Sequence, residues 1–178
     1  MATPKLLGIC GSLRSGSTNR KLLDEAVRLF GECDYSLADI RFPLYDGDLE
    51  EAEGIPGAVK AFRDQIDAAD GILISTTEYN KGPSGVLKNA LDWVSRVKGP
   101  SWGGKPTAIM SAANGRAGGE RAQMHLRAFL VPFRPHLAVG PEIHLADSSN
   151  QFDDDGRLKS EQYIKELGQL MEALRALI

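Results

Sequence analysis

The apolar run Leu6-Leu7-Gly8-Ile9-Cys10 is followed directly by Gly11-Ser-Leu-Arg-Ser-Gly-Ser-Thr-Asn19, in which only Leu13 is apolar. The periodicity after Asn19 predicts an amphipathic helix, so the polar stretch joins a buried strand to a helix. The first backbone N–H groups of a helix lack partners within the helix and carry the positive end of its dipole. Hydroxyls, an amide and Arg14 can join them. The stretch therefore predicts an anion site, and phosphate is the anion that suits it best.

Three known phosphate motifs do not match this stretch. A Walker A loop requires lysine where this chain has Ser17, and the dinucleotide fingerprint requires glycine where it has Leu13. Arg14 also follows Cys10 too closely for the loop of a thiol phosphatase, so we expect Cys10 to be a buried strand residue. These mismatches favour a monophosphate. The alternative is a polar turn in which Ser17 is only the N-cap of the helix.

Composition restricts the class of protein. A chain of 178 residues with 42% hydrophobic residues suits one domain, residues 1–178, with a sizeable core. The net charge of -3, without a stripe of lysine and arginine, argues against nucleic acid as a partner. No apolar stretch is long enough to cross a membrane, and the first predicted strand leaves no room for a signal peptide, so we expect a cytoplasmic protein. Cys10 and Cys33 are predicted to be free thiols.

Strands and helices are predicted to alternate along the chain. Continuous apolar runs such as Ile72–Ile74 and Ala108–Met110 are typical of parallel strands that helices cover on both faces. We therefore expect an α/β fold, a three-layer doubly wound sandwich around a five-stranded parallel sheet. The expected strands lie near residues 5–10, 34–40, 71–76, 106–112 and 136–145, and the expected helices near 18–31, 56–69, 84–97, 119–130 and 159–177. The longest irregular stretches are expected near 41–55 and 146–158.

Ligands of such sheets bind beyond the carboxyl ends of the strands, which directs attention to the loops 11–19, 77–84 and 113–119. The second loop offers the aromatic ring of Tyr79 beside backbone hydrogen-bonding groups, and the third contains three glycines. Together they suit a flat heteroaromatic ring, and with the first loop they describe a mononucleotide site. Taken separately, the second loop is also compatible with a surface turn ended by Pro83, and the third with a flexible helix entry.

The sequence resembles the NADPH-dependent FMN reductases of the flavodoxin-like superfamily, which include quinone, azo-dye and chromate reductases. The resemblance covers nearly the whole chain. It rests on Gly11–Asn19, on Glu78-Tyr79-Asn80 with the following Gly85–Trp93, and on Gly104-Lys105-Pro106 with Gly118-Gly119. It implies the flavodoxin-like strand order 2-1-3-4-5, with FMN and NADPH, or NADH, as cofactors.

The resemblance also implies roles for particular residues. Those expected to hold the FMN phosphate are Ser12, Arg14, Ser17, Thr18 and Asn19; those expected along the isoalloxazine are Thr77, Glu78, Tyr79 and Asn80, with Ser111 and Gly115 at its other edge. Hydride would pass from the nicotinamide to FMN and then to a quinone-like or other diffusible acceptor, with ping-pong kinetics. Because the cofactor carries this chemistry, no side chain is nominated as a catalytic acid, base or nucleophile.

The second loop departs from the family pattern. Family members usually have proline before Glu-Tyr-Asn and a Gly-Ser-Ile-Pro-like stretch after it, whereas this chain has Thr77 and Lys81-Gly82-Pro83-Ser84. We therefore expect the turn beside the flavin to differ in shape. Lys81 is a candidate to hold the reduced flavin anion or a phosphate of NADPH, and the alternative is an exposed lysine without a role.

Two other function classes fit part of the sequence. A flavodoxin-type electron carrier would hold FMN without its own NAD(P)H reductase activity, but such carriers commonly present an acidic face around the flavin. Here basic residues lie in or beside the site loops, namely Arg14, Lys81, Lys88 and Arg116. A nucleotide-binding module without redox chemistry would account for the first loop and leave the other two unexplained.

No metal site is predicted. Asp153-Asp154-Asp155-Gly156 resembles part of a calcium loop but has Gln162 where the bidentate carboxylate belongs, and the three histidines lack ligand spacing. The resemblance suggests a homodimer or homotetramer. Trp93 and Trp102 are candidates either for a subunit interface or for burial within the monomer, and Arg116 and Glu142 are candidates for subunit contacts.

Overall fold

The computed structural model describes residues 2–99 and 102–178, and its centre is one parallel sheet. The strands are β1 (Lys5–Cys10), β2 (Asp34–Leu37), β3 (Gly71–Thr76), β4 (Pro106–Ala112), β5 (His136–Leu137) and β6 (Ile143–Leu145). Their order is β2-β1-β3-β4-β5, and β6 also pairs with β4. The predicted α/β fold and its flavodoxin-like strand order are confirmed.

The fifth position of the sheet is filled by two short strands, where the sequence predicted one strand over residues 136–145. β5 pairs with the beginning of β4, at Pro106 and Thr107, and β6 pairs with its end, from Met110 to Ala112. Between them lies Gly140-Pro141, where Gly140 has a positive φ of 55°. Proline has no N–H to donate to a neighbouring strand, so the ladder is interrupted there.

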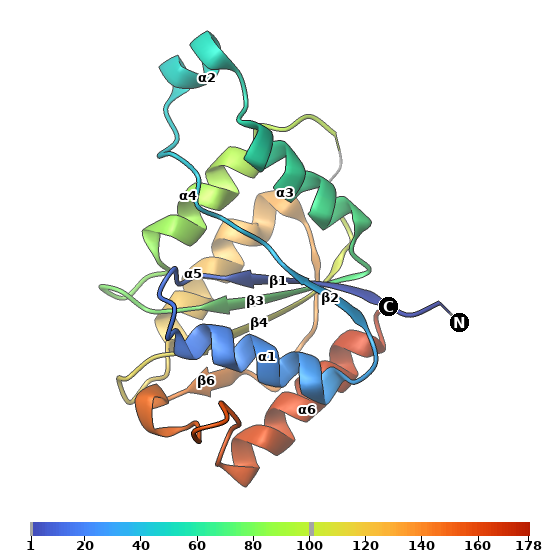
Figure 1. Cartoon of the computed structure of the whole chain (residues 1–178), viewed down its shortest axis with the longest axis vertical. Coiled ribbons are helices and arrows are strands. Elements are labelled where there is room, and N and C mark those ends of the chain that lie inside the picture. Colours follow the sequence, from blue (N-terminus) through green and yellow to red (C-terminus); the bar gives the residue numbers. More distant parts are fainter. Residues whose placement is uncertain (1, 100–101) are drawn as a thin grey trace.

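Helices cover both faces of the sheet, as Figure 1 shows. On one face lie α1 (Thr18–Phe30) and α6 (Glu161–Arg175), and on the other lie α3 (Gly57–Ala68), α4 (Gly85–Val94) and α5 (Glu120–Leu130). Alternate residues of each strand supply the two cores. In β1, Leu6 and Cys10 pack on the α1 and α6 side, whereas Leu7 and Ile9 pack on the other. Each face is thus a separate hydrophobic layer.

The first helix illustrates how local sequence sets an element. Its N-cap is Ser17, whose hydroxyl accepts a hydrogen bond from Arg20 N at 3.4 Å. One side of the helix is apolar and buried, including Leu22, Leu23 and Phe30. It ends at Phe30, and the following Gly31 caps it with a positive φ of 89°. This geometry directs the helix N-terminus toward the carboxyl end of β1.

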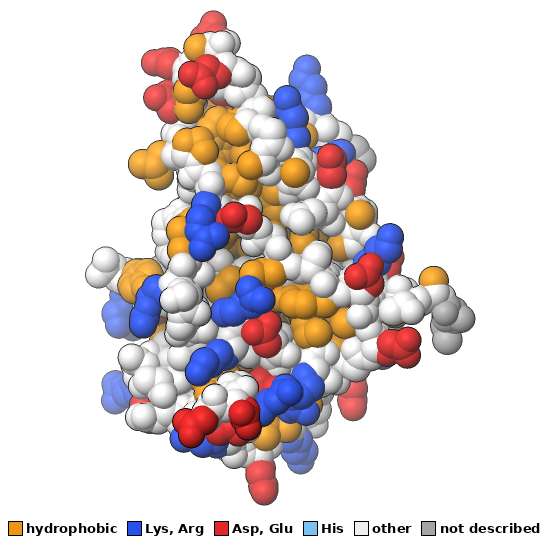
Figure 2. Space-filling model, viewed as in Figure 1, with side chains coloured by type: hydrophobic (Ala, Val, Ile, Leu, Met, Phe, Trp, Pro, Cys, Tyr) orange, Lys and Arg blue, Asp and Glu red, His pale blue; other side chains and the backbone are white. Residues whose placement is uncertain are grey.

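A short helix was not predicted within residues 41–55. The helix α2 (Gly47–Glu53) is capped by Asp46, whose carboxylate accepts from Asp48 N at 2.9 Å, and none of its residues is buried. It projects from the rest of the molecule (Figure 1), and its acidic side chains gather on this arm (Figure 2). Without a buried face, the helix produces no hydrophobic periodicity that would reveal it in the sequence.

The two tryptophans are buried within the chain itself. Trp93 is 0% exposed and its ring N–H donates to Pro43 O at 2.8 Å. Trp102 is 1% exposed and donates to Thr107 Oγ1 at 3.3 Å. Of the two alternatives open from the sequence, burial within the monomer is correct and an interface role for the tryptophans is wrong. Among the described residues, no helix is both long and apolar enough to span a membrane.

Candidate functional site

A cleft of about 980 Å³ lies at the carboxyl ends of β1, β3 and β4. All three loops singled out from the sequence contribute to it. Of the predicted site residues, its lining contains Arg14, Thr18, Thr77, Glu78, Tyr79 and Gly115. The other five, which are Ser12, Ser17, Asn19, Asn80 and Ser111, are not part of the lining surface. The structure thus brings the three loops together and divides the predicted residues into two groups.

The first loop presents backbone donors at the start of α1. Ser17 is buried and forms a turn, because its N–H donates to Arg14 O at 3.2 Å. Ser12 accepts from Arg14 N at 3.4 Å, which fixes the beginning of the same turn. Within the described part of the chain, the N–H groups of Ser15 and Gly16 donate no hydrogen bond. These donors and the exposed Arg14 lie together at the N-terminus of α1, an arrangement that is able to hold an anion.

Asn19 has a different position from the one its sequence context suggested. Its side chain is 2% exposed and lies behind the loop, between the ends of β3 and β4. Its Nδ2 donates to Ala112 O at 2.9 Å, and its Oδ1 accepts from Ala112 N at 2.9 Å and from the Ser75 hydroxyl at 2.8 Å. Asn19 therefore joins the first turn of α1 to two neighbouring strands.

The second loop contains a tight turn over residues 79–82. Tyr79 and Gly82 exchange two backbone hydrogen bonds of 3.0 Å, and the two residues between them, Asn80 and Lys81, have positive φ values of 50° and 70°. This is the dihedral pattern of a two-residue hairpin turn with left-handed central residues. The side chain of Tyr79 is 57% exposed, and the ring nitrogen Nδ1 of His125 lies 3.0 Å from Lys81 O.

Glu78 connects the second loop to α5. Its Oε2 accepts a hydrogen bond at 3.2 Å from Ala122 N, in the first turn of that helix. The helix has Gly119 at its N-cap, which supplies no side-chain cap, so the carboxylate of Glu78 takes that role from another part of the chain. The side chain of Glu78 is thereby oriented, and the residue is part of the cleft lining.

The third loop is held close to β4 and β6 by its glycines. A Cβ on Gly118 would collide with His144 O, and a Cβ on Gly119 would lie 2.7 Å from the Ser111 hydroxyl. Both residues have positive φ values, 57° and 94°. Ser111 is fully buried, donates to Gly118 O at 2.6 Å and accepts from Gln123 Nε2 at 2.9 Å. Its side chain therefore shapes the loop from behind.

Sequence reasoning missed a fourth segment of the cleft. Ser148 and Ser149 line it, as does Asn114 from the third loop. The Ser148 hydroxyl lies 3.1 Å from Thr18 Oγ1 and 3.1 Å from Asn114 Oδ1, so it joins the segment after β6 to two site loops. The sequence did contain a signal for this segment, because it follows the carboxyl end of β6, where ligands of such sheets bind. The prediction of one long strand over residues 136–145 hid the separate strand β6 and therefore this signal.

The cleft is rich in cations. Its lining contains the basic residues Arg14, Lys21, Lys81, Arg116 and Arg121 against the carboxylates Glu78 and Glu120. Across residues 2–99 and 102–178, none of these five cations forms an ion pair, and Lys21 Nζ instead lies 5.6 Å from the centre of the Phe152 ring. An excess of unpaired positive charge in a concave site favours anionic ligands.

Cys10 lies in a buried environment at the end of β1. Burial raises the pKa of the Cys10 thiol, and a hydrogen-bond contact with Ser17 Oγ at 3.9 Å offsets this only in part. The expectation that Cys10 is a buried strand residue is confirmed. In the described part of the chain, no group of three or more histidine, cysteine, aspartate and glutamate side chains is placed to hold a metal ion.

Comparison with known proteins identifies the family. The family model for NADPH-dependent FMN reductase matches residues 4–151. An NAD(P)H-dependent FMN reductase of Pseudomonas aeruginosa is 46% identical over 173 residues, which cover 96% of this chain and 93% of that protein. A quinone reductase of Escherichia coli is 42% identical over 154 residues, covering 84% of this chain and 81% of that protein.

A solved structure agrees with these sequence relatives. The flavoenzyme NAD(P)H:(acceptor) oxidoreductase FerB of Paracoccus denitrificans has a TM-score of 0.87 and 30% identity, and the match covers 98% of this chain and 97% of that one. The shared fold, the matching family model and the level of identity lead to one conclusion. The chain belongs to the NADPH-dependent FMN reductase family and is an oxidoreductase that uses FMN and NAD(P)H.

Proposed function

We propose that the cleft holds FMN with its phosphate at residues 11–19 and its isoalloxazine between the 79–82 turn and the 113–119 loop. The observation that carries this assignment is the cleft of about 980 Å³ to which all three loops contribute. Its size lies within the range of cofactor sites, and its position at the carboxyl ends of the strands is where doubly wound sheets bind ligands.

The phosphate end of the cleft fits a dianion. The free N–H groups of Ser15 and Gly16 and the positive end of α1 supply donors, and Arg14 supplies a full charge. Thr18 lies at the same edge, with its hydroxyl already engaged by Ser148. In this proposal Ser12, Ser17 and Asn19 act by shaping the loop, and the direct ligands are Arg14 and backbone groups.

The ring end of the cleft fits a flat heteroaromatic group. Tyr79 offers an exposed aromatic side chain, and the turn that follows it fixes the direction of the Thr77 to Asn80 backbone. Gly115 allows close approach from the opposite side. Glu78 and Ser111 hold these two walls from behind, by their bonds to Ala122 and Gly118.

The proposed reaction needs little from side chains beyond positioning and charge. When bound, FMN accepts a hydride from NAD(P)H and passes two electrons to a quinone-like or other diffusible acceptor. The unpaired cations Lys81, Arg116 and Arg121 attract the anionic nicotinamide dinucleotide and offset negative charge near the ring. Because one cleft serves both partners in turn, we expect ping-pong kinetics. The names of relatives such as the Escherichia coli quinone reductase support a quinone as acceptor.

We also propose that the chain is a single domain that functions as a homodimer or homotetramer in the cytoplasm. Large apolar side chains remain exposed after α5 and β5, with Val131 at 69% and Val139 at 91%, and Met124 on α5 itself is 60% exposed. Apolar groups that the monomer does not bury are candidates for a subunit interface. Sedimentation at several protein concentrations tests this, and a monomer at all of them would contradict it.

Titration of the apoprotein with FMN and with riboflavin tests the proposed site. Riboflavin has the same ring but no phosphate, so we expect it to bind at least about tenfold more weakly than FMN. Arg14→Ala is expected to weaken FMN and to leave riboflavin unchanged. Arg41→Ala, which removes an exposed arginine that pairs with Asp39, is the matched control. Equal affinities for the two flavins would contradict the phosphate assignment.

A further inference from the structure

The segment 147–158 is attached to α1 at three successive points. Ser148 Oγ accepts from Thr18 Oγ1 at 3.1 Å, and the Phe152 ring lies 5.6 Å from Lys21 Nζ. Farther along, Leu158 N donates to the Glu25 carboxylate at 3.3 Å. The α1 residues are spaced at i, i+3 and i+7, so they share one face of the helix. The segment therefore runs along α1 from the cleft to Glu25.

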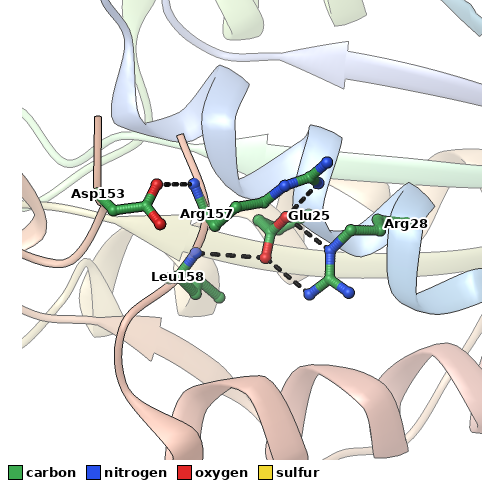
Figure 3. A network of polar contacts seen from close by, with 5 residues as sticks. All are labelled: Glu25, Arg28, Asp153, Arg157 and Leu158. Atoms are coloured by element: carbon green, nitrogen blue, oxygen red, sulfur yellow. Dashed lines mark hydrogen bonds and ion pairs between the residues drawn. The ribbon is translucent and has the colours of Figure 1, made fainter. Parts of the chain in front are cut away.

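Glu25 is a buried carboxylate with four hydrogen bonds (Figure 3). Its side chain is 1% exposed. Two bonds of 2.9 Å come from Arg28, one helical turn farther along α1. The other two come from the segment, from Arg157 Nη1 at 2.9 Å and from Leu158 N. A buried charge is stable only when its hydrogen bonds are made, so this position strongly favours the attached arrangement.

The segment is internally ordered between its attachments. Phe152 and Leu158 form an antiparallel bridge, and both side chains belong to the buried core beneath α1 and α6. Asp153 closes the turn, because its carboxylate accepts from Arg157 N at 2.8 Å (Figure 3). Lys159 N donates to Gln151 O at 2.9 Å. Arg157 therefore belongs to a short hairpin that is closed by its own hydrogen bonds.

The other end of the segment forms part of the cleft wall. Asn114 Oδ1 accepts from the Ser148 hydroxyl at 3.1 Å and from Ser149 N at 3.0 Å. Ser148 N also donates to Ala113 O at 3.3 Å. Three residues of the cleft lining, Asn114, Ser148 and Ser149, are thus fixed by one another. The beginning of the third loop, at Ala113 and Asn114, is thus bonded directly to the segment that lies on α1.

We propose that Glu25 is a positioning residue for the cofactor cleft, acting through Arg157 and the segment 147–158 to hold Ser148, Ser149 and Asn114 in place. The proposal rests on the proposed FMN site, because these three residues line it. Glu25 does not itself touch the cleft: it lies seven residues along α1 from Thr18, about 10 Å by helical rise. Its effect on the cofactor is therefore indirect.

The two arginines on Glu25 provide a matched pair of variants. Arg28 and Arg157 both bind the same carboxylate, and their side chains are similarly exposed, at 41% and 54%. Arg28 belongs to α1 and connects the helix only to itself, whereas Arg157 connects it to the segment. Arg28→Ala removes ionic contacts without detaching the segment. Arg157→Ala removes a contact between the segment and the helix. Glu25→Gln weakens the contacts of both arginines with residue 25.

Two readouts on these variants test the proposal. The first is the dissociation constant of FMN for the apoprotein, measured by quenching of flavin fluorescence. We expect it to rise about tenfold in Glu25→Gln and several-fold in Arg157→Ala, while Arg28→Ala stays within about twofold of the wild type. The second is amide hydrogen exchange over residues 147–158 in the apoprotein, expected to be faster in the first two variants and unchanged in Arg28→Ala.

The outcomes separate this inference from the proposed function. If the wild-type apoprotein does not bind FMN, the proposed function fails, and the exchange data still decide whether Glu25 holds the segment. If FMN binds to the wild type and Arg157→Ala binds it as tightly as Arg28→Ala does, the inference is overturned. Equal losses in both arginine variants, with a lowered melting temperature and unchanged exchange over 147–158, would likewise make Glu25 only a stabilising residue.

Discussion

Three buried polar side chains around the cleft, Ser17, Asn19 and Ser111, form their hydrogen bonds within the chain. Ser17 caps α1, Asn19 joins β3 to β4, and Ser111 holds the loop that ends at Gly118. By contrast, Arg14 and Tyr79 are exposed at or beside the cleft. At this scale, burial distinguishes residues that position the site from residues able to touch a ligand. The sequence alone does not distinguish the two groups, because both consist of polar residues in the same loops.

Asn19→Ala is expected to destabilise the fold. It would leave both backbone groups of Ala112 and the Ser75 hydroxyl without their partner, in a place that is almost fully buried. Unpaired buried groups of this kind cost roughly 2–3 kcal/mol in the free energy of unfolding. Urea denaturation of the apoprotein measures this. Asn150→Ala, which removes only exposed bonds to Asp147, is the control and is expected to stay within about 0.5 kcal/mol.

Flavin binding by the same variant separates the two roles considered for Asn19. If its side chain acts through the strand ends, FMN and riboflavin affinities fall by the same factor. A loss confined to FMN would instead make Asn19 a direct phosphate ligand, contrary to the position that the structure gives it. A change in unfolding free energy no larger than that of Asn150→Ala would contradict the structural role.

Lys81→Gly is expected to stabilise the apoprotein. Lys81 has a φ of 70°, a left-handed conformation that costs a residue with a side chain about 1 kcal/mol and glycine almost nothing. Asn-Gly is the preferred pair for such a turn. Allowing for the greater freedom of glycine in the unfolded chain, we expect a gain of roughly 0.5 kcal/mol by urea denaturation. Lys81→Ala retains the unfavourable φ and should not show this gain; an equal gain in both variants would contradict the explanation.

The same position tests the role of the Lys81 charge. If Lys81 helps to hold an anionic partner, both variants raise the Michaelis constant for NADPH, and Lys81→Arg restores it. Unchanged Michaelis constants and flavin potential in Lys81→Ala would leave the lysine as an exposed side chain without a role.

Among the elements, one of the three attachments of the 147–158 segment to α1 is made by the Glu25 carboxylate. Burial raises the pKa of this carboxyl, but hydrogen bonds from Arg28, Arg157 and Leu158 N outweigh it, so the pKa lies below its ordinary value of 4.5. A carboxyl with a lowered pKa contributes stability that is present above its unfolded pKa. That contribution is lost as the pH falls through the folded pKa.

We therefore expect the difference in unfolding free energy between the wild type and Glu25→Gln to be greatest at neutral pH. It should decrease as the solution is acidified from about pH 5 through the lowered pKa. Urea denaturation at a series of pH values measures the difference directly. A difference that is constant with pH, or one that grows in acid, would contradict an ionised Glu25 in the folded protein.

The buried strand β3 was predictable from the sequence, and the exposed helix α2 was not. Ile72, Leu73 and Ile74 form a continuous apolar run because helices cover both faces of β3, and the run predicted the strand to within its ends. The exposed α2 has no such pattern. The break between β5 and β6 at Gly140-Pro141 was marked in the sequence, but the apolar residues on both sides suggested one strand.

At the scale of the whole molecule, the position of the site followed from topology. Loops after β1, β3 and β4 meet because parallel strands end at the same edge of the sheet, and that rule requires no knowledge of side-chain contacts. The contribution of Ser148 and Asn114 could not be predicted in this way. Their contacts span 34 residues and depend on where β6 ends, which is a property of the packed chain.

Anaerobic titration of the FMN-loaded protein with NADPH, and separately with NADH, tests whether the whole enzyme reduces its flavin with a nicotinamide. We expect either or both nicotinamides to bleach the visible absorption of the bound flavin when no acceptor is present, and we expect a quinone then to restore it. FMN that binds tightly but is bleached by neither nicotinamide would contradict the account and indicate an electron carrier without its own reductase activity.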